Sequence, residues 1–309
     1  MDIFLQQLIN GLVLGSVYAL VALGYTMVYG ILELINFAHG EVTMIGAMVA
    51  LAVISALVGS GVDLPGMFIV LLGLLAAIPA CMVLGYTIER VAYRPLRNAP
   101  RLAPLITAIG VSIVLQNVAM LIWGKQYIAF PPILPLTRHE IGGASITDLQ
   151  IFILILSCVL MAGLILLVHK TKLGRAMRAT AQAPKIAGLM GVNINSIISI
   201  TFILGSVLAA IAGVMVSAYY GLAHYYMGFM LGLKAFSAAV LGGIGNIAGA
   251  MLGGLLLGVI ESLGAGYIGD ITGGFLGSQY QDVFAFFVLI LVLVFRPSGL
   301  LGERVVERA

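Results

Sequence analysis

Charged residues are scarce in this chain of 309 residues: they make up 9% of the sequence, whereas apolar residues make up 61%. A soluble domain carries roughly 25% charged residues, so this chain cannot build a water-facing surface. Cysteine is rare too, and Cys81 and Cys158 both lie inside apolar runs, which excludes a disulfide framework or a thiol-based metal cluster. The composition excludes soluble enzymes, nucleic-acid-binding proteins and disordered chains, and it predicts a multi-pass membrane protein.

Long apolar runs are what the sequence has in abundance. A helix needs about 20 mostly apolar residues to cross a bilayer, and backbone groups left unpaired in lipid are costly, so each run is expected to be helical. The qualifying runs are 8–28, 41–59, 66–88, 102–123, 149–168, 196–218, 247–268 and 280–296, with two shorter or interrupted pieces near 29–40 and 226–243. The predicted fold class is an all-α polytopic membrane protein with eight long transmembrane helices and two short or broken ones.

Positive charge is concentrated in three segments. Residues 89–101 contain Arg90, Arg94, Arg97 and Arg101, residues 169–195 contain Lys170, Lys172, Arg175, Arg178 and Lys185, and the tail contains Arg296, Arg304 and Arg308. Cytoplasmic loops carry an excess of Lys and Arg, so these segments and the C-terminus are expected inside. For successive segments to cross the membrane in opposite directions, 226–243 must cross inward. If the N-terminus is cytoplasmic, 29–40 must also cross inward. The main alternative is an outside N-terminus with 29–40 not crossing.

The two halves of the chain have apolar segments in a similar order. A Gly-flanked short segment precedes a long helix in each half, at 30–38 and again at 232–238. Internal repeats with a discontinuous helix at matching positions are typical of transporters. We predict two structurally similar halves within one transmembrane domain over 1–309: a first repeat (about 8–88), connecting helices (about 102–168), a basic loop (about 169–195), a second repeat (about 196–296) and a tail (297–309).

Ionisable residues inside or beside the apolar runs are the candidates for a translocation pathway. Each costs about 2.5–3.5 kcal/mol at a helix centre, so such residues usually face protein, water or a partner. The candidates are Asn36, His39, Glu41 and Lys234, together with a flexible break at Gly242, Gly243 and Gly245. Hydrated helix ends and a simple turn are the alternatives, and a hydrated helix end is favoured for Glu33 and Glu261. A Glu41–Lys234 contact would join the two halves.

Two other patterns concern packing and the basic loop. Gly245, Gly249 and Gly253 recur every four residues, which places them on one helix face and favours close packing over ligand binding. A short helix is predicted from Pro184 to about Met190, because proline suits the first helical turn and Gly191 suits the residue past the end. Docking on a soluble partner and maintaining the membrane topology explain this basic helix equally well.

No catalytic set is evident in the sequence. ATP hydrolysis needs a phosphate-binding loop that ends in Gly-Lys-Ser/Thr, and no lysine of the chain stands in that setting. The four histidines are isolated from one another, so no paired-His metal site is expected. We therefore expect a protein that is not an enzyme and has no cofactor or metal of its own, driven by a partner that hydrolyses nucleotide. A stand-alone secondary transporter, with Glu33, Glu41 or Glu261 coupling to an ion, is the alternative.

Motifs spread over nearly the whole chain carry a family resemblance. They include Gly24–Gly30 (GYTMVYG), Ile35–Glu41 (INFAHGE), Ile88–Leu96 (IERVAYRPL), Leu115–Asn117 (LQN), Leu173–Ala176 (LGRA), Lys234–Phe236 (KAF) and Ala239–Gly245 (AVLGGIG). These stretches resemble the inner-membrane permease of the bacterial branched-chain amino acid ABC importer, in the first of its two permease forms. Related permeases carry urea, short amides or other small solutes, and only the resemblance favours leucine, isoleucine and valine over these.

The resemblance implies a multi-pass protein of the bacterial inner membrane that works with partners. These would be a second homologous permease, two cytoplasmic ATPase subunits that bind the ATP, and a periplasmic amino-acid-binding protein. It also implies that the basic loop carries the helix that couples to an ATPase, with Arg175, Arg178, Gln182, Pro184, Lys185, Gly188 and Gly191 as its candidate residues. An acidic pair commonly stands in the family where this chain has Gln182-Ala183, which puts a carboxylate contact there in doubt.

Overall fold

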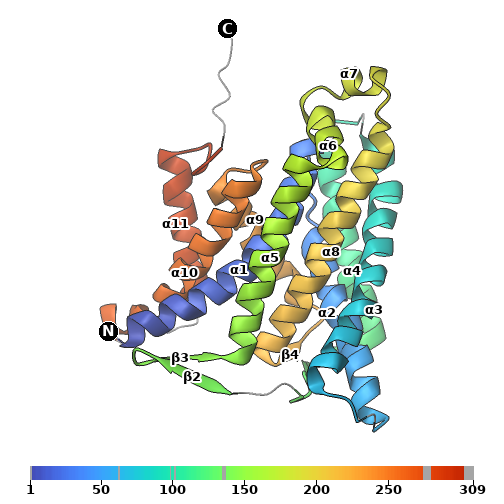
Figure 1. The fold of residues 1–309 in the computed structure, drawn as a ribbon. Helices are drawn as coiled ribbons and strands as arrows, with labels where there is room; N and C mark the ends of the chain where they lie inside the picture. Colours follow the sequence, from blue (N-terminus) through green and yellow to red (C-terminus); the bar gives the residue numbers. More distant parts are fainter. Residues whose placement is uncertain are drawn as a thin grey trace.

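The computed structural model describes residues 2–61, 63–97, 99–100, 102–133, 137–273 and 280–302, and most of them are helical (Figure 1). Within these residues, seven helices are long and apolar enough to span a membrane. They are α1 (Asp2–Leu32), α2 (His39–Gly59), α3 (Gly66–Thr87), α4 (Leu102–Trp123), α5 (Asp148–Lys170), α8 (Ile194–Tyr220) and α10 (Ile247–Ile271). Two shorter apolar helices, α9 (Met227–Gly242) and α11 (Gln281–Phe295), complete the bundle. The chain is an all-α polytopic membrane protein.

The structure differs from the predicted helices at two places. The run at 280–296, expected to form a long helix, forms α11 of 15 residues. The crossing at 29–40, expected only with a cytoplasmic N-terminus, is not formed, because α1 continues to Leu32 and α2 begins at His39, with a non-helical link between them. Glu33 has a φ of 53°, the left-handed conformation that commonly follows the last residue of a helix, and it ends α1 there.

The remaining elements lie at the two ends of the bundle. Near the top of Figure 1 are α6 (Lys172–Gln182), α7 (Pro184–Leu189), the π-helical turn η1 (Ile88–Tyr93) and the 3-10 turn η2 (Arg94–Leu96). At the lower end, β2 (Arg138–Ile141) pairs antiparallel with β3 (Ala144–Thr147), and β1 (Ile128–Ala129) pairs with β4 (Leu222–Ala223). These short strands were not predicted. We call the two ends the upper and the lower end below.

The N-terminal and C-terminal parts of the described chain lie at opposite ends of the bundle (Figure 1). At the lower end, the Gln6 amide donates to the backbone oxygen of Ser145 at 3.0 Å and accepts from the backbone N–H of Ser145 at 2.8 Å. At the upper end, the backbone N–H of Leu300 donates to the Leu241 oxygen at 2.9 Å. This arrangement fits the alternative topology, in which the two termini lie on opposite sides and 29–40 does not cross.

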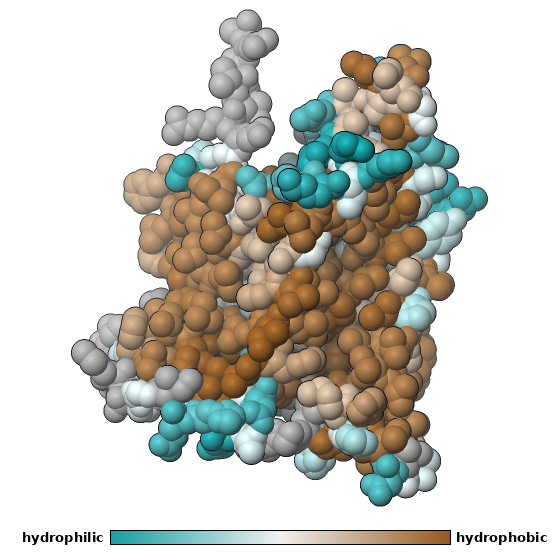
Figure 2. All heavy atoms as spheres, viewed as in Figure 1, coloured by the Kyte–Doolittle hydropathy of each residue, from teal (hydrophilic) through white to brown (hydrophobic). Residues whose placement is uncertain are grey.

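Polar and apolar residues are separated along the long axis of the bundle. Figure 2 shows a broad hydrophobic band over the helices, with hydrophilic residues gathered around α6 above it and around β2 and β3 below it. The described parts of all three basic segments lie at the upper end (Figure 1). Arg101, Arg304 and Arg308 lie outside the described residues. The charge distribution predicted from sequence is therefore present in the fold.

Glycines allow the helices at the centre of the bundle to pack closely. The most extensive helix contact joins α1 to α10. A Cβ added to Gly15 of α1 would lie 2.8 Å from the Leu255 Cα, which is closer than side chains pack. On the neighbouring face of α10, a Cβ on Gly253 would lie 2.7 Å from the Gly242 nitrogen, and Gly249 also faces Gly242 of α9. Small residues at such interfaces are how membrane helices approach one another.

Candidate functional site

The link between α1 and α2 brings non-helical backbone and polar side chains into the interior of the bundle. Asn36 is 3% exposed, and its side-chain oxygen accepts a hydrogen bond from the Tyr93 hydroxyl at 3.2 Å. Glu41 follows in the first turn of α2, and its Oε1 faces α4. Non-helical backbone at membrane depth is tolerated where protein buries it or where it lines a cavity. The predicted candidates Asn36, His39 and Glu41 thus lie together in one buried segment.

Glu41 lies opposite the middle of a transmembrane helix. Its Oε1 accepts hydrogen bonds from the Gln116 amide at 2.7 Å and from the Ser112 hydroxyl at 3.0 Å. Both donors stand near the centre of α4, so the carboxylate is at about the middle of the bundle. Glu41 is 1% exposed, and its Oε2 has no hydrogen-bond partner in the described part of the chain. A buried carboxylate in this position is a strong indication of a functional site.

A groove of about 190 Å³ lies beside this carboxylate, between α1, α4 and α9. Its lining residues are Tyr25, Phe37, Ile109, Ser112, Ile113, Gln116, Tyr226, Phe229, Gly232 and Leu233. The two residues that donate to Glu41 therefore also belong to the polar part of the groove wall. Aromatic rings make up much of the rest, and Phe236 packs behind them, with its ring centroid 5.6 Å from that of Phe37 and 6.1 Å from that of Tyr25.

His39 fills the space between α1 and α8 beside the groove. Its ring meets Tyr25 edge-on at 5.0 Å between centroids. The ring also packs against Gly24, where a side chain would overlap it, and a Cβ on Gly205 would lie 3.4 Å from its Cε1. The imidazole is 2% exposed, so it supports the wall of the groove from behind.

Lys234 faces away from Glu41, and the contact suggested between them is not formed. Its Nζ lies 2.7 Å from Oε1 of Glu261 and 2.8 Å from Oδ1 of Asp282. The Tyr18 hydroxyl donates to the same Glu261 oxygen at 3.2 Å. Glu261 is 0% exposed, so its expected place at a hydrated helix end was wrong. Lys234 does not reach Glu41 because it lies on the face of α9 that packs against α1 and α10. That face does not line the groove.

Gly242, Gly243 and Gly245 lie at the upper end of α9 and do not line the groove. Gly243 has a φ of 106°, which ends the helix. The backbone oxygen of Gly242 accepts from the N–H of Leu301 at 2.9 Å, and the side chain of Asn246 donates to the Leu301 oxygen at 2.9 Å. The glycine-rich turn therefore binds the segment that follows α11 through these hydrogen bonds.

The basic loop forms two helices that project at the upper end, α6 and α7 (Figure 1). Pro184 is the first residue of α7, and Gly191, with a φ of 89°, stands just past its end. Arg178 donates to the backbone oxygen of Val168 at 2.9 Å, which fixes α6 to the end of α5. Arg175, Gln182, Pro184, Lys185, Gly188 and Gly191 are all exposed.

Apolar side chains are exposed on α7 as well as basic ones. Leu189 is 87% exposed and Met190 is 81% exposed, and Ile186 is also largely exposed. These residues lie beyond the hydrophobic band, next to Lys185. An exposed apolar patch with a polar rim indicates a surface that contacts another protein.

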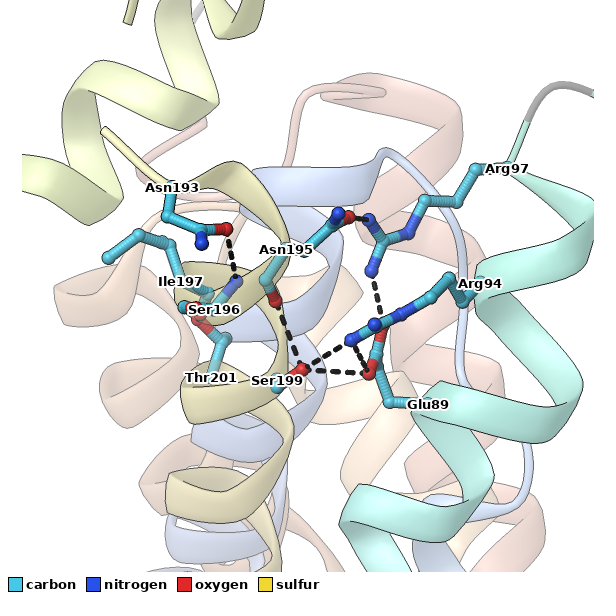
Figure 3. Close-up of polar contacts among 9 residues, drawn as sticks. All are labelled: Glu89, Arg94, Arg97, Asn193, Asn195, Ser196, Ile197, Ser199 and Thr201. Atoms are coloured by element: carbon cyan, nitrogen blue, oxygen red, sulfur yellow. Dashed lines mark hydrogen bonds and ion pairs between the residues drawn. The ribbon is translucent and has the colours of Figure 1, made fainter. Parts of the chain in front are cut away.

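A buried carboxylate at the upper end joins α3 to α8 (Figure 3). Glu89, in η1, is 0% exposed. Arg94 donates to it twice, at 3.2 Å and 2.9 Å, and Arg97 forms a further ion pair with it. The Ser199 hydroxyl of α8 donates to its Oε2 at 2.8 Å. Single π-helical turns such as η1 are frequent at functional sites.

Arg97 extends this cluster toward α7. Its Nη1 donates to Oδ1 of Asn195 at 2.6 Å, two residues after Asn193 caps the start of α8 (Figure 3). The pKa of Arg97 is lowered, chiefly because the guanidinium is partly buried, although the Glu89 carboxylate acts in the opposite direction. The end of α3 is therefore tied to the helix that directly follows α7. Glu89, Asn195 and Ser199 were not among the predicted site residues.

The fold and these sites together define a polytopic membrane protein with a largely apolar groove beside a buried carboxylate at mid-depth and a projecting basic helix pair at one end, as expected for a subunit of a membrane transporter. Comparison with known proteins makes this specific. Residues 7–293 match the family model of the branched-chain amino acid transport system, permease component. The chain belongs to this permease family.

Relatives from several organisms match nearly the whole chain. The high-affinity branched-chain amino acid transport system permease protein BraD of Pseudomonas aeruginosa is 50% identical over 99% of this chain and 98% of its own length. The corresponding protein LivH of Escherichia coli is 47% identical over 99% and 97%. The autoinducer 2 import system permease protein LsrC of Photorhabdus luminescens is 35% identical over 41% of this chain and 38% of its own length. No solved structure matches the chain.

Proposed function

We propose that this chain is a translocating subunit of an ATP-driven importer that moves leucine, isoleucine or valine across the bacterial inner membrane by alternating access. The observation that carries the proposal is the near full-length similarity to BraD and LivH, which are named for branched-chain amino acid transport. The groove beside Glu41 supports it, because aromatic walls with a few polar groups suit a small solute that is charged at one end and aliphatic at the other.

The proposed orientation places the upper end in the cytoplasm. The described basic residues of 89–101, 169–195 and the tail lie at that end, and Lys and Arg are enriched on the cytoplasmic side of membrane proteins. The C-terminus is then cytoplasmic and the N-terminus lies on the periplasmic side. The hairpin of β2 and β3 faces the periplasm, where an amino-acid-binding protein would deliver the substrate.

Energy enters this arrangement from partner subunits. Two cytoplasmic ATPases would bind the ATP, this chain would have no ATPase site of its own, and a second homologous permease would complete the pathway. We propose that α6 and α7 dock on an ATPase, because Ile186 and Leu189 of α7 and the capping residue Met190 are exposed beside basic residues. Docking at this position buries apolar area that is otherwise exposed to water.

The Glu89 cluster offers a route from the docking helix into the membrane. Movement of α7 displaces the start of α8, and Asn195 and Ser199 connect that start to Arg97, Arg94 and Glu89. The end of α3 then moves with it, and Tyr93 of the same turn contacts Asn36 of the buried link. We propose that this chain of contacts connects the cytoplasmic face to the groove. The division into two similar halves stays a prediction.

Uptake by a strain that lacks this chain tests the proposed function. Radiolabelled leucine uptake is measured in the deletion strain and in the complemented strain, with unlabelled isoleucine, valine and urea as competitors. We expect complementation to restore leucine uptake, and isoleucine and valine but not urea to compete. Competition by urea would show that the chain also accepts a solute outside the branched-chain amino acids. Unchanged leucine uptake in the deletion strain would contradict the proposal.

A further inference from the structure

We propose that Glu41 receives the α-ammonium group of the amino acid in transit, while the aromatic walls of the adjoining groove hold its aliphatic side chain. This inference rests on the proposed function. It assigns a chemical role to one carboxylate and predicts which analogues of the substrate the groove accepts.

The charge of Glu41 is the first argument. Three carboxylates of the described chain are buried almost completely: Glu41, Glu89 and Glu261. Glu89 is paired with two arginines and Glu261 with Lys234. Glu41 has only neutral donors among the described residues, the Ser112 hydroxyl and the Gln116 amide. Because buried charges in proteins are normally paired, a cationic group that enters the groove would supply the partner that this carboxylate lacks among the described residues.

The position of the donors is the second argument. Ser112 and Gln116 hold Oε1 and also line the groove, so they mark where the carboxylate meets the groove wall. Oε2 is buried without a described hydrogen-bond partner. An ammonium group has three donors in need of acceptors, and displacement of the Gln116 side chain gives it access to a carboxylate that is already oriented. Gln116 is half-buried, which leaves its side chain room to move.

The size and the walls of the groove are the third argument. At about 190 Å³ it is smaller than the pockets of about 300–1,000 Å³ that hold drug-sized ligands, so it suits a solute of few atoms. Tyr25, Phe37 and Phe229 offer apolar surface within reach of the carboxylate. The groove therefore has the small size and the apolar surface that suit a short aliphatic side chain.

The test uses the reconstituted complex with all its subunits and a single cysteine in the groove wall. Cys81 and Cys158 are replaced by serine, and Ile113→Cys provides a thiol that N-ethylmaleimide modifies. The rate of modification is measured with leucine, with isoamylamine, which keeps the amine and lacks the carboxylate, and with 4-methylpentanoate, which keeps the carboxylate and lacks the amine. The same measurements are made on Glu41→Gln, and on Glu33→Gln as a control at an exposed helix end.

We expect leucine and isoamylamine to slow the modification and 4-methylpentanoate not to do so. In Glu41→Gln, the leucine concentration for half-maximal protection should rise about tenfold or more, because a charge-assisted bond becomes a neutral one, and Glu33→Gln should behave as the parent. Equal protection by the two analogues would overturn the proposal even if Glu41→Gln fails to assemble. Leucine protection that is unchanged in Glu41→Gln would overturn it too, as would a thiol that leucine does not protect.

ATP-driven leucine uptake by the parent complex is measured in parallel, so that the two claims fail separately. Uptake without ammonium-dependent protection would remove the role of Glu41 and leave the proposed function intact. Absence of leucine uptake by the complete complex would count against the proposed function itself.

Discussion

Lys234 carries a positive charge into the bundle, and its partners determine what that charge costs. Its Nζ is 2.7 Å from Glu261, whose carboxylate is fully buried. Removal of one member of such a pair leaves an uncompensated buried charge and costs about 3–5 kcal/mol, whereas replacement of both by apolar or neutral groups is often close to neutral. We therefore expect Lys234→Met to lower the thermal unfolding midpoint of the detergent-solubilised protein strongly, and Lys234→Met combined with Glu261→Gln to recover much of the loss.

The double variant is the informative one in this experiment, because each single variant can be unstable for its own reason. Asp282 also contacts Lys234 and remains in all variants, so it sets an upper limit on the recovery. Additive losses in the double variant would show that the two residues do not form a pair. Thermal unfolding followed by size-exclusion chromatography provides the measurement.

Glu89 is predicted to position α3 relative to α8. Glu89→Gln keeps the shape of the side chain but removes the charge that holds Arg94 and Arg97, so a loss of roughly 1–3 kcal/mol is expected from the weakened bonds. We expect the purified complex to retain its ATPase subunits while leucine uptake per ATP hydrolysed falls several-fold. If the variant is less stable but takes up as much leucine per ATP hydrolysed as the parent, the role of Glu89 is only structural.

For single residues, the sequence showed which ionisable side chains lie inside the bundle more reliably than it showed which side chains contact them. Glu41 stood out because it is ionisable beside an apolar run, and the structure places it in the buried interior. The Lys234–Glu261 pair was missed because pairing depends on which faces of α9 and α10 meet, and a single sequence does not contain that information. A signal for the Glu89 cluster existed: an acid followed by several arginines at the end of an apolar helix.

Among the elements, the contact between α1 and α10 depends on glycine. Gly15→Leu should prevent close approach, because even a Cβ at this position would lie 2.8 Å from the Leu255 Cα. Gly110→Leu in α4 is the matched control, because a Cβ there has no neighbour within 4 Å. We expect Gly15→Leu to reduce the amount of monodisperse protein extracted from membranes, and Gly110→Leu to leave it unchanged. Similar yields for the two variants would contradict this account of the interface.

The end of α7 depends on a glycine for a different reason. Gly191 has a φ of 89°, which L side chains rarely adopt, and no atom lies close enough to clash with a Cβ there. Gly191→Val, alone or with a bulky residue at Gly188, should therefore distort the exposed helix without disturbing the bundle. We expect normal insertion into the membrane and loss of leucine uptake, measured as quantitative membrane blots beside transport assays. Normal uptake would remove α7 from the coupling route.

Helices were predicted correctly where the length of an apolar run determines their extent. The prediction failed where the local backbone conformation determines where a helix ends. Apolar runs located the long helices to within three residues at each end, except for α1, which extends six residues before and four residues beyond the predicted run. The segment 29–40 was misread because the end of α1 is set by the left-handed conformation of Glu33, which no hydropathy pattern reveals. In the structure this segment is a buried link between α1 and α2, and its polar residues lie beside the groove.

For the molecule as a whole, the distribution of charge and the family resemblance were readable from sequence, and the course of the pathway was not. Positive residues marked one end of the bundle, and the motifs indicated the family that the comparisons then showed. The groove is formed by residues of α1, α4 and α9, which are distant in sequence, so it emerges only when the helices pack. Ser112 and Gln116 were therefore not among the predicted pathway residues.

The central claim is that this chain moves solute only when partner ATPases act on its upper end. The test is leucine accumulation in two preparations of proteoliposomes. One contains the complete complex, with the binding protein on the side that the lower end faces. The other contains this chain alone, under a proton or sodium gradient. We expect accumulation that requires hydrolysable ATP and the ATPase subunits, and none by the chain alone under either gradient. Gradient-driven accumulation by the isolated chain would contradict it.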